Sequence, residues 1–123
     1  MYRWKANSSS GITMELPVVN HEDYFAKIGE EHKFPINKFG ELANYLIQNK
    51  IVKKFHKPYA CSLETLSYAH SENYISSIKN KTLNKDEVKK IGFPIVDSVV
   101  QRSLVATGGT VLASKLAINY GIS

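Results

Sequence analysis

The feature that most constrains this chain is a long apolar segment in its last third. The stretch from Leu104 to Ala113 contains no charged residue and lies inside a helical pattern from about Ile95 to Tyr120, which Gly121 can end as a C-terminal cap. A helix that is apolar around most of its circumference is normally buried on several sides. The fold must therefore supply other elements that cover this helix.

Two consecutive glycines, Gly108 and Gly109, lie in the middle of the same segment. Each costs about 1 kcal/mol relative to alanine in a helix interior, so their presence predicts that another backbone packs closely there. The alternative is a break into two helices at this point. We favour one continuous helix because the apolar spacing resumes from Thr110.

A second helix is predicted from Ile36 to Asn49, after Pro35 in the first turn. Apolar residues recur there at spacings of three and four and share one face: Ile36, Phe39, Ala43, Leu46 and Ile47.

Three short helices are predicted to begin after good N-terminal capping residues, which are Ser62, Ser71 and Asn84. Glu87 lies three residues after Asn84, the spacing of a capping box, and Gly92 is the expected end of that helix.

Residues 15–21 and 51–55 are short and rich in β-branched residues, so they are predicted to be strands. Between the first strand and the helix at 36, the chain is expected to be irregular with one helical turn. Short strands that are followed by helices predict an α/β fold with parallel strands and flanking helices. Two strands are few for a parallel sheet, so the pattern also predicts that part of the domain is missing.

The chain has 123 residues, the length of one domain. Cys61 is the only cysteine, which excludes an internal disulfide and favours a cytoplasmic location. No apolar run reaches the roughly 18 residues that would span a bilayer, so no membrane association is expected. Residues 1–13 are polar and are interpreted as a flexible leader.

The net charge of +5 raises the question of nucleic-acid binding. The lysines, however, are dispersed over two regions, and Asp86 and Glu87 interrupt the second: Lys50, Lys53, Lys54 and Lys57, then Lys79, Lys81, Lys85, Lys89 and Lys90. We interpret them as solvated surface residues, and nucleic acid as an unfavoured partner.

Neither a catalytic set nor a metal site is recognisable from spacing. No pair among the four histidines has the spacing of a helical metal site, and His56 with Cys61 gives only a weak zinc pattern. Cys61 has no base close to it in the sequence, and the paired carboxylates are adjacent residues that point to different faces. No catalytic residue and no metal ligand is therefore predicted in this chain.

Five segments nevertheless form an ordered set: "NHEDYF" at 20–25, "EHKFPINKF" at 31–39, "HSENYI" at 70–75, "KIGFP" at 90–94 and "GGTVLASKLAINYG" at 108–121. Together they resemble the N-terminal part of the histone deacetylase superfamily, closest to its bacterial and class IV branch. The resemblance implies an arginase/deacetylase-like α/β fold and zinc-dependent hydrolysis of acetyl-lysine or a related acylated amine. Residues 14–123 would be the incomplete N-terminal part of such a domain.

The catalytic residues that the resemblance implies are a tandem histidine pair, a zinc set of two aspartates and a histidine, and a tyrosine, all expected downstream of Gly121. Only secondary roles match positions in this chain. Phe93 and Pro94 correspond to the rim of the substrate channel, although the next position, commonly aromatic in the family, is Ile95. Lys38 corresponds to a basic residue near an inner cavity; its helical phase fits an ordinary surface lysine equally well.

The resulting hypothesis is that this chain is the N-terminal third of a zinc-dependent deacetylase. The chain would be inactive alone, and Zn2+ would bind only to the complete domain. One alternative is a subunit that completes a split deacetylase together with a separately encoded C-terminal fragment. Another is a small basic nucleic-acid-binding module, whose affinity would fall steeply with salt.

Overall fold

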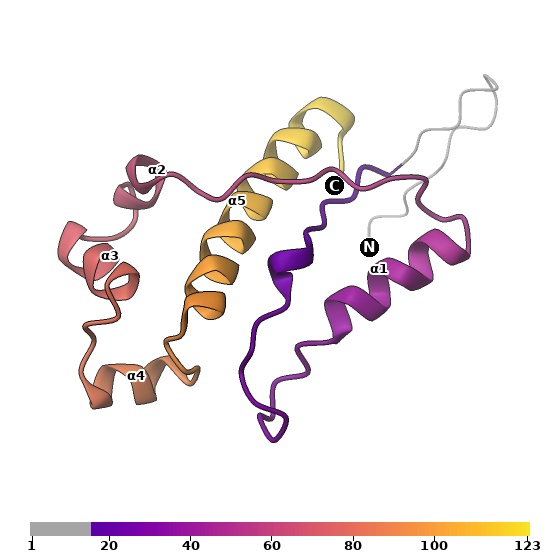
Figure 1. The fold of residues 1–123 in the computed structure, drawn as a ribbon. Coiled ribbons are helices and arrows are strands. Elements are labelled where there is room, and N and C mark those ends of the chain that lie inside the picture. The colour runs from indigo at the N-terminus through magenta and orange to yellow at the C-terminus, as the bar shows by residue number, and fades with distance from the viewer. Residues whose placement is uncertain (1–15) are drawn as a thin grey trace.

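The computed structural model describes residues 16–123, and these fold into helices and connecting segments (Figure 1). In chain order the elements are the 3-10 turn η2 (Glu22–Tyr24), then α1 (Lys38–Gln48), α2 (Leu63–Ser67), α3 (Glu72–Lys79), α4 (Lys85–Ile91) and α5 (Asp97–Tyr120). The predicted leader, residues 1–13, lies outside the described residues, as do Met14 and Glu15.

Helix α5 is the longest of these elements and lies between two parts of the fold. Figure 1 shows α2, α3 and α4 as a limb beside it and α1 with the η2 segment on its other side. The helix is continuous through Gly108 and Gly109, and Gly121 ends it in the left-handed conformation at φ 84°. The predicted continuous helix and its glycine cap are confirmed.

The two mid-helix glycines face other parts of the chain at very short range. A methyl group on Gly108 would lie 1.9 Å from the backbone carbonyl oxygen of Tyr59, and one on Gly109 would lie 1.9 Å from the Tyr24 hydroxyl. The backbone N–H of Cys61 donates to the Leu104 carbonyl at 2.9 Å beside this crossing. The predicted close approach of another backbone is therefore confirmed at Gly108.

The short helices begin where capping residues predicted them. The hydroxyls of Ser62 and Ser71 accept the backbone N–H groups of the third residues that follow them. Asn84 and Glu87 form the predicted capping box, with both hydrogen bonds at 2.9 Å. Gly92 then ends α4 with φ 79°.

The two predicted strands are wrong. Val19 and His56 form one isolated parallel β-bridge, and residues 16–123 contain no strand and no sheet. After α1 the chain turns through Lys50 at φ 56°, and the backbone N–H groups of Ile51 and Val52 both donate to the Leu46 carbonyl. Because these donors complete the end of α1, they are not available to a sheet ladder.

The α/β fold class and the arginase-like architecture are wrong for the same reason. Helices dominate the described residues, and the bridge between Val19 and His56 holds two irregular segments together without extending into a strand pair. After Val19 the chain enters η2 at Glu22, and η2 packs against α5. The fold of residues 16–123 is accordingly helical.

The buried core is small and apolar. Ala26, Ile28, Ile36 and Val99 form its central cluster, and three half-buried aromatic rings pack against it, those of Phe34, Phe39 and Phe93. No polar side chain of residues 16–123 is buried. Within the same range, no helix combines the length and the apolar character that a membrane span needs.

The apolar face predicted for α1 is only partly covered. Ile36 and Ala43 are buried as expected, but Ile47 is 41% exposed. Leu42 and Tyr45, on the rest of the helix surface, are each 57% exposed. Helix α1 thus contacts the core through a narrow strip.

Candidate functional site

The aromatic cluster beside the core contains two of the three residues singled out by the resemblance. The ring centroids of Phe34 and Phe93 lie 5.3 Å apart in an edge-to-face arrangement, and those of Phe34 and Phe39 lie 6.3 Å apart. Lys38 places its Nζ atom 4.8 Å from the Phe34 centroid and 5.1 Å from that of Phe39. Phe93 and Lys38 therefore meet around one ring, that of Phe34.

The same rings contact a second cation. The guanidinium carbon of Arg102, on α5, lies 5.6 Å from the Phe34 centroid and 5.2 Å from that of Phe39. Cations over aromatic faces are attracted by the ring quadrupole. Two cations from different elements thus stabilise the pair of rings, and the Lys38 side chain remains exposed to solvent.

His32 fastens Phe93 to this cluster. Its ring stacks on Phe93 with centroids 5.1 Å apart and an interplanar angle of 12°. The Phe34 backbone N–H donates to His32 Nδ1 at 3.1 Å, so the ring proton of the neutral imidazole is on Nε2, which donates to the Gly92 carbonyl at 2.9 Å. Pro94, the other predicted rim residue, is half-buried next to Phe93 in the chain.

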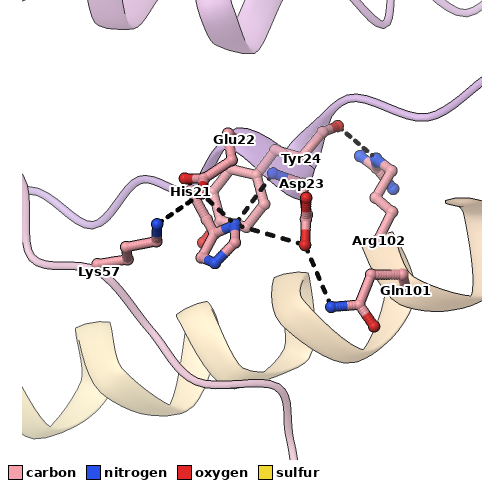
Figure 2. Close-up of polar contacts among 7 residues, drawn as sticks. All are labelled: His21, Glu22, Asp23, Tyr24, Lys57, Gln101 and Arg102. Atoms are coloured by element: carbon pink, nitrogen blue, oxygen red, sulfur yellow. Dashed lines mark hydrogen bonds and ion pairs between the residues drawn. The ribbon is translucent and has the colours of Figure 1, made fainter.

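A polar network ties η2 to α5, as Figure 2 shows. Arg102 Nε donates to the Tyr24 carbonyl at 2.9 Å, and Gln101 Nε2 donates to Asp23 Oδ2 at 3.1 Å. The Tyr24 ring meets the Phe39 ring edge-on at 6.0 Å. Burial raises the pKa of the Tyr24 hydroxyl, and the nearby Arg102 charge opposes this rise.

The other end of η2 is bound to the segment that leaves the β-bridge. Lys57 Nζ donates to Glu22 Oε1 at 2.5 Å, and this hydrogen bond is the main reason that the pKa of Glu22 lies below its ordinary value. His21 Nδ1 accepts the backbone N–H of Asp23 at 3.0 Å and so caps η2. Carboxylate oxygens of Glu22 and Asp23 lie 3.7 and 3.9 Å from the same nitrogen.

These contacts join η2 to α5 and to the segment that contains Lys57. Within residues 16–123, no group of three or more His, Cys, Asp or Glu side chains could hold a metal ion. Sequence reasoning missed this polar network, because its partners lie 78 positions apart in the chain and no motif joins them. The only usable signal was that Gln101 and Arg102 lie in the polar first half of an otherwise apolar helix.

A groove of about 620 Å3 lies between α5 and the limb formed by α2, α3 and α4. Its lining is mostly aliphatic, and Phe93 contributes to it, whereas Pro94 and Lys38 do not. The structure thus places the three residues from the resemblance at different positions: Phe93 at the junction of cluster and groove, Lys38 on the outer side of the cluster, and Pro94 beside Phe93.

No protein-family model matches this sequence. An uncharacterised protein of Picosynechococcus sp. is 35% identical over 112 residues, which are 89% of this chain and 37% of that protein. Histone deacetylase 2 of Arabidopsis thaliana is 30% identical over 106 residues, which are 79% of this chain and 27% of that protein. The chain is therefore similar to part of a histone deacetylase and spans well under half the length of either relative.

Proposed function

We propose that this chain is the N-terminal part of a zinc-dependent deacetylase that hydrolyses acetyl-lysine or a related acylated amine. The observation that carries the proposal is the 30% identity to Arabidopsis thaliana histone deacetylase 2 across 79% of this chain. The five ordered sequence segments agree with it. The activity belongs to a longer assembly, because the chain spans only 27% of that relative and 37% of the Picosynechococcus protein.

The residues that perform the chemistry would come from another part of the deacetylase, which is either continuous with this sequence or separately encoded. We call that part the complementary polypeptide. The sequence contains no tandem histidine pair and no Asp-x-His pattern. A zinc ion held by the complementary polypeptide would supply an acidified, nucleophilic water for amide hydrolysis. The contribution of this chain is to hold Phe93 and Pro94 in place for the substrate side chain.

The contacts of Phe93 suit such a positioning role. Its ring is clamped between the stacked His32 and the edge of Phe34, so it cannot change rotamer without breaking both contacts. One side of it lines the groove beside α5. An acylated lysine presents a long aliphatic stem, which packs favourably on a fixed aromatic surface. Lys38, over the far side of Phe34 and Phe39, supports the cluster and does not contact substrate.

The experiment measures hydrolysis of an acetyl-lysine peptide with added Zn2+. The chain alone is expected to show no turnover above a blank, and Arabidopsis histone deacetylase 2 serves as the positive control for the substrate. Adding the part of the Picosynechococcus protein outside the 112 matched residues is expected to give a complex that binds zinc and hydrolyses the peptide. Turnover by the chain alone, or a complex that binds no zinc, contradicts the proposal.

The basic nucleic-acid module is the less favoured function. Two of the lysines that produce the net positive charge are already paired within the chain, Lys57 with Glu22 and Lys81 with Asp97. Counterion release makes such binding strongest at low salt. Tight binding to duplex or single-stranded DNA in low salt, with a steep salt dependence, would support the module instead.

A further inference from the structure

The groove beside α5 is an unfilled apolar space within the fold. Aliphatic side chains line it from four helices: Leu66 from α2, Ile75 and Ile78 from α3, Ile91 from α4, and Val100 and Leu104 from α5. The groove has a volume of about 620 Å3 and is partly open to solvent, and its aliphatic lining offers ordered water few of the polar partners that it needs.

The limb and α5 are connected at the two ends of the groove. At one end the backbone N–H of Cys61 donates to the Leu104 carbonyl at 2.9 Å, and at the other Lys81 forms an ion pair with Asp97. Figure 1 shows the limb of α2, α3 and α4 to one side of α5. The aliphatic side chains that line the groove from both sides are only half-buried by residues 16–123, among them Ile75, Ile78 and Leu104.

The rim of the groove extends this apolar surface outward. Leu63 and Tyr74 both line the groove and are 46% and 43% exposed. A small molecule inside the groove would leave this rim uncovered. A polypeptide segment that lies along the groove would cover both.

The charged groups of the lining are all basic. Lys79 and Arg102 contribute cations, His70 contributes an imidazole, and no aspartate or glutamate of residues 16–123 lines the groove. Arg102 already lies over the Phe34 and Phe39 rings, so Lys79 is the lining cation that can pair with a bound segment. The occupant is therefore expected to present apolar side chains to the groove and acidic side chains to its rim.

We propose that this groove is the docking site for an amphipathic, acidic-flanked segment of the polypeptide that completes the deacetylase. The inference rests on the proposed function. The lengths of the relatives identify the occupant: this chain corresponds to 37% of one and 27% of the other, so in both proteins the matching region is joined to a much longer remainder. That remainder is the polypeptide available to cover the apolar groove and its rim.

The first test measures the affinity of the full 123-residue chain for the unmatched part of the Picosynechococcus protein by isothermal titration calorimetry. Ile78→Asn places an amide in the groove and is expected to weaken binding by at least about ten-fold. Ile118→Asn is the matched control, because Ile118 is 84% exposed and lies outside the groove. It is expected to change affinity by less than about two-fold.

The second test uses smaller changes in the groove than Ile78→Asn and reads out access in place of affinity. Val100→Cys in a Cys61→Ser background places a single thiol in the groove, and its labelling by a maleimide reports access. The complementary polypeptide is expected to slow this labelling by at least about ten-fold, whereas a thiol from Ile118→Cys in the same background continues to react.

Each outcome is decisive. Strong binding that Ile78→Asn leaves unchanged, with the thiol at 100 still reactive, refutes the groove as the docking site but leaves the proposed function intact. Concentration-dependent protection of that thiol in the chain alone identifies a second copy as the occupant and also refutes the inference. Absence of any binding by the wild-type chain refutes both the inference and the proposed function.

Discussion

Replacing Gly108 by alanine is the most direct test of how α5 packs. The added methyl group would lie 1.9 Å from the Tyr59 carbonyl oxygen and 3.2 Å from the Cys61 nitrogen. Both atoms belong to the backbone, so no side-chain rotation relieves the clash. The segment 59–61 must move away, and the hydrogen bond from Cys61 to Leu104 is then lost.

The size of the change in unfolding free energy follows from two destabilising terms and one stabilising term. Overpacking of this kind costs about 1–3 kcal/mol, and loss of the hydrogen bond costs about 1 kcal/mol more. The higher helix propensity of alanine returns about 1 kcal/mol. The expected result for Gly108→Ala is therefore a decrease of about 1–3 kcal/mol in the free energy of unfolding, in spite of the better helix former.

The assay is urea unfolding of the full chain, followed by circular dichroism at 222 nm. For a slope of about 2 kcal/mol per molar urea, the midpoint should fall by about 1 M. Gly40→Ala in α1 is the matched control, since nothing lies within 4 Å of the added methyl group and stability should rise by up to about 1 kcal/mol. A Gly108→Ala chain at least as stable as wild type would falsify the close backbone crossing.

Three further changes have defined outcomes. Asn84→Ala removes the capping box of α4 and should lower stability by about 1 kcal/mol, seen as faster amide exchange in that helix. The pKa of Glu22 should lie below its ordinary value of 4.5 in an NMR titration and move toward that value in Lys57→Met. Because the pKa of Glu22 is lower in the folded state, the stability that this group contributes is present above about pH 4.5 and is lost as pH falls. A Lys57→Met chain whose stability falls with acid in the same way as that of the wild type would contradict the pairing. The pKa of Tyr24, followed by ultraviolet absorbance, should lie above its ordinary value of 10.0. The contribution of this group to stability is then complete below pH 10 and is lost as pH rises further. A titration midpoint at or below 10 would show that the ring is not buried as described.

The helices could be predicted from the sequence because their signals are local. Ser62, Ser71 and Asn84 each accept a backbone N–H within three residues, and Gly92 and Gly121 end helices through their own φ angles. The pair of glycines in α5 also predicted a tertiary contact. Glycine is unfavourable in a helix interior, so its presence there indicates that another segment packs against the helix at that position.

The strands were predicted wrongly because β-structure depends on partners that propensity does not reveal. Residues 51–55 have the composition of a strand, yet the N–H groups of Ile51 and Val52 complete the end of α1. The polar network at η2 was missed for a related reason. Its contacts are long-range, and each member, such as Asp23 or Gln101, looks like an ordinary surface residue in isolation.

The distance along the chain between η2 and α5 also determines when this protein can fold during synthesis. Asp23 and Tyr24 meet their partners only after 78 further positions have been made, which takes about 4–16 seconds at a typical bacterial or eukaryotic translation rate. Ala26 and Ile28 pack in one cluster with Val99 of α5, so this part of the core stays incomplete throughout that interval. We therefore expect the yield of this chain to depend on chaperones that bind nascent chains more than the yield of a helical protein with mainly local contacts does.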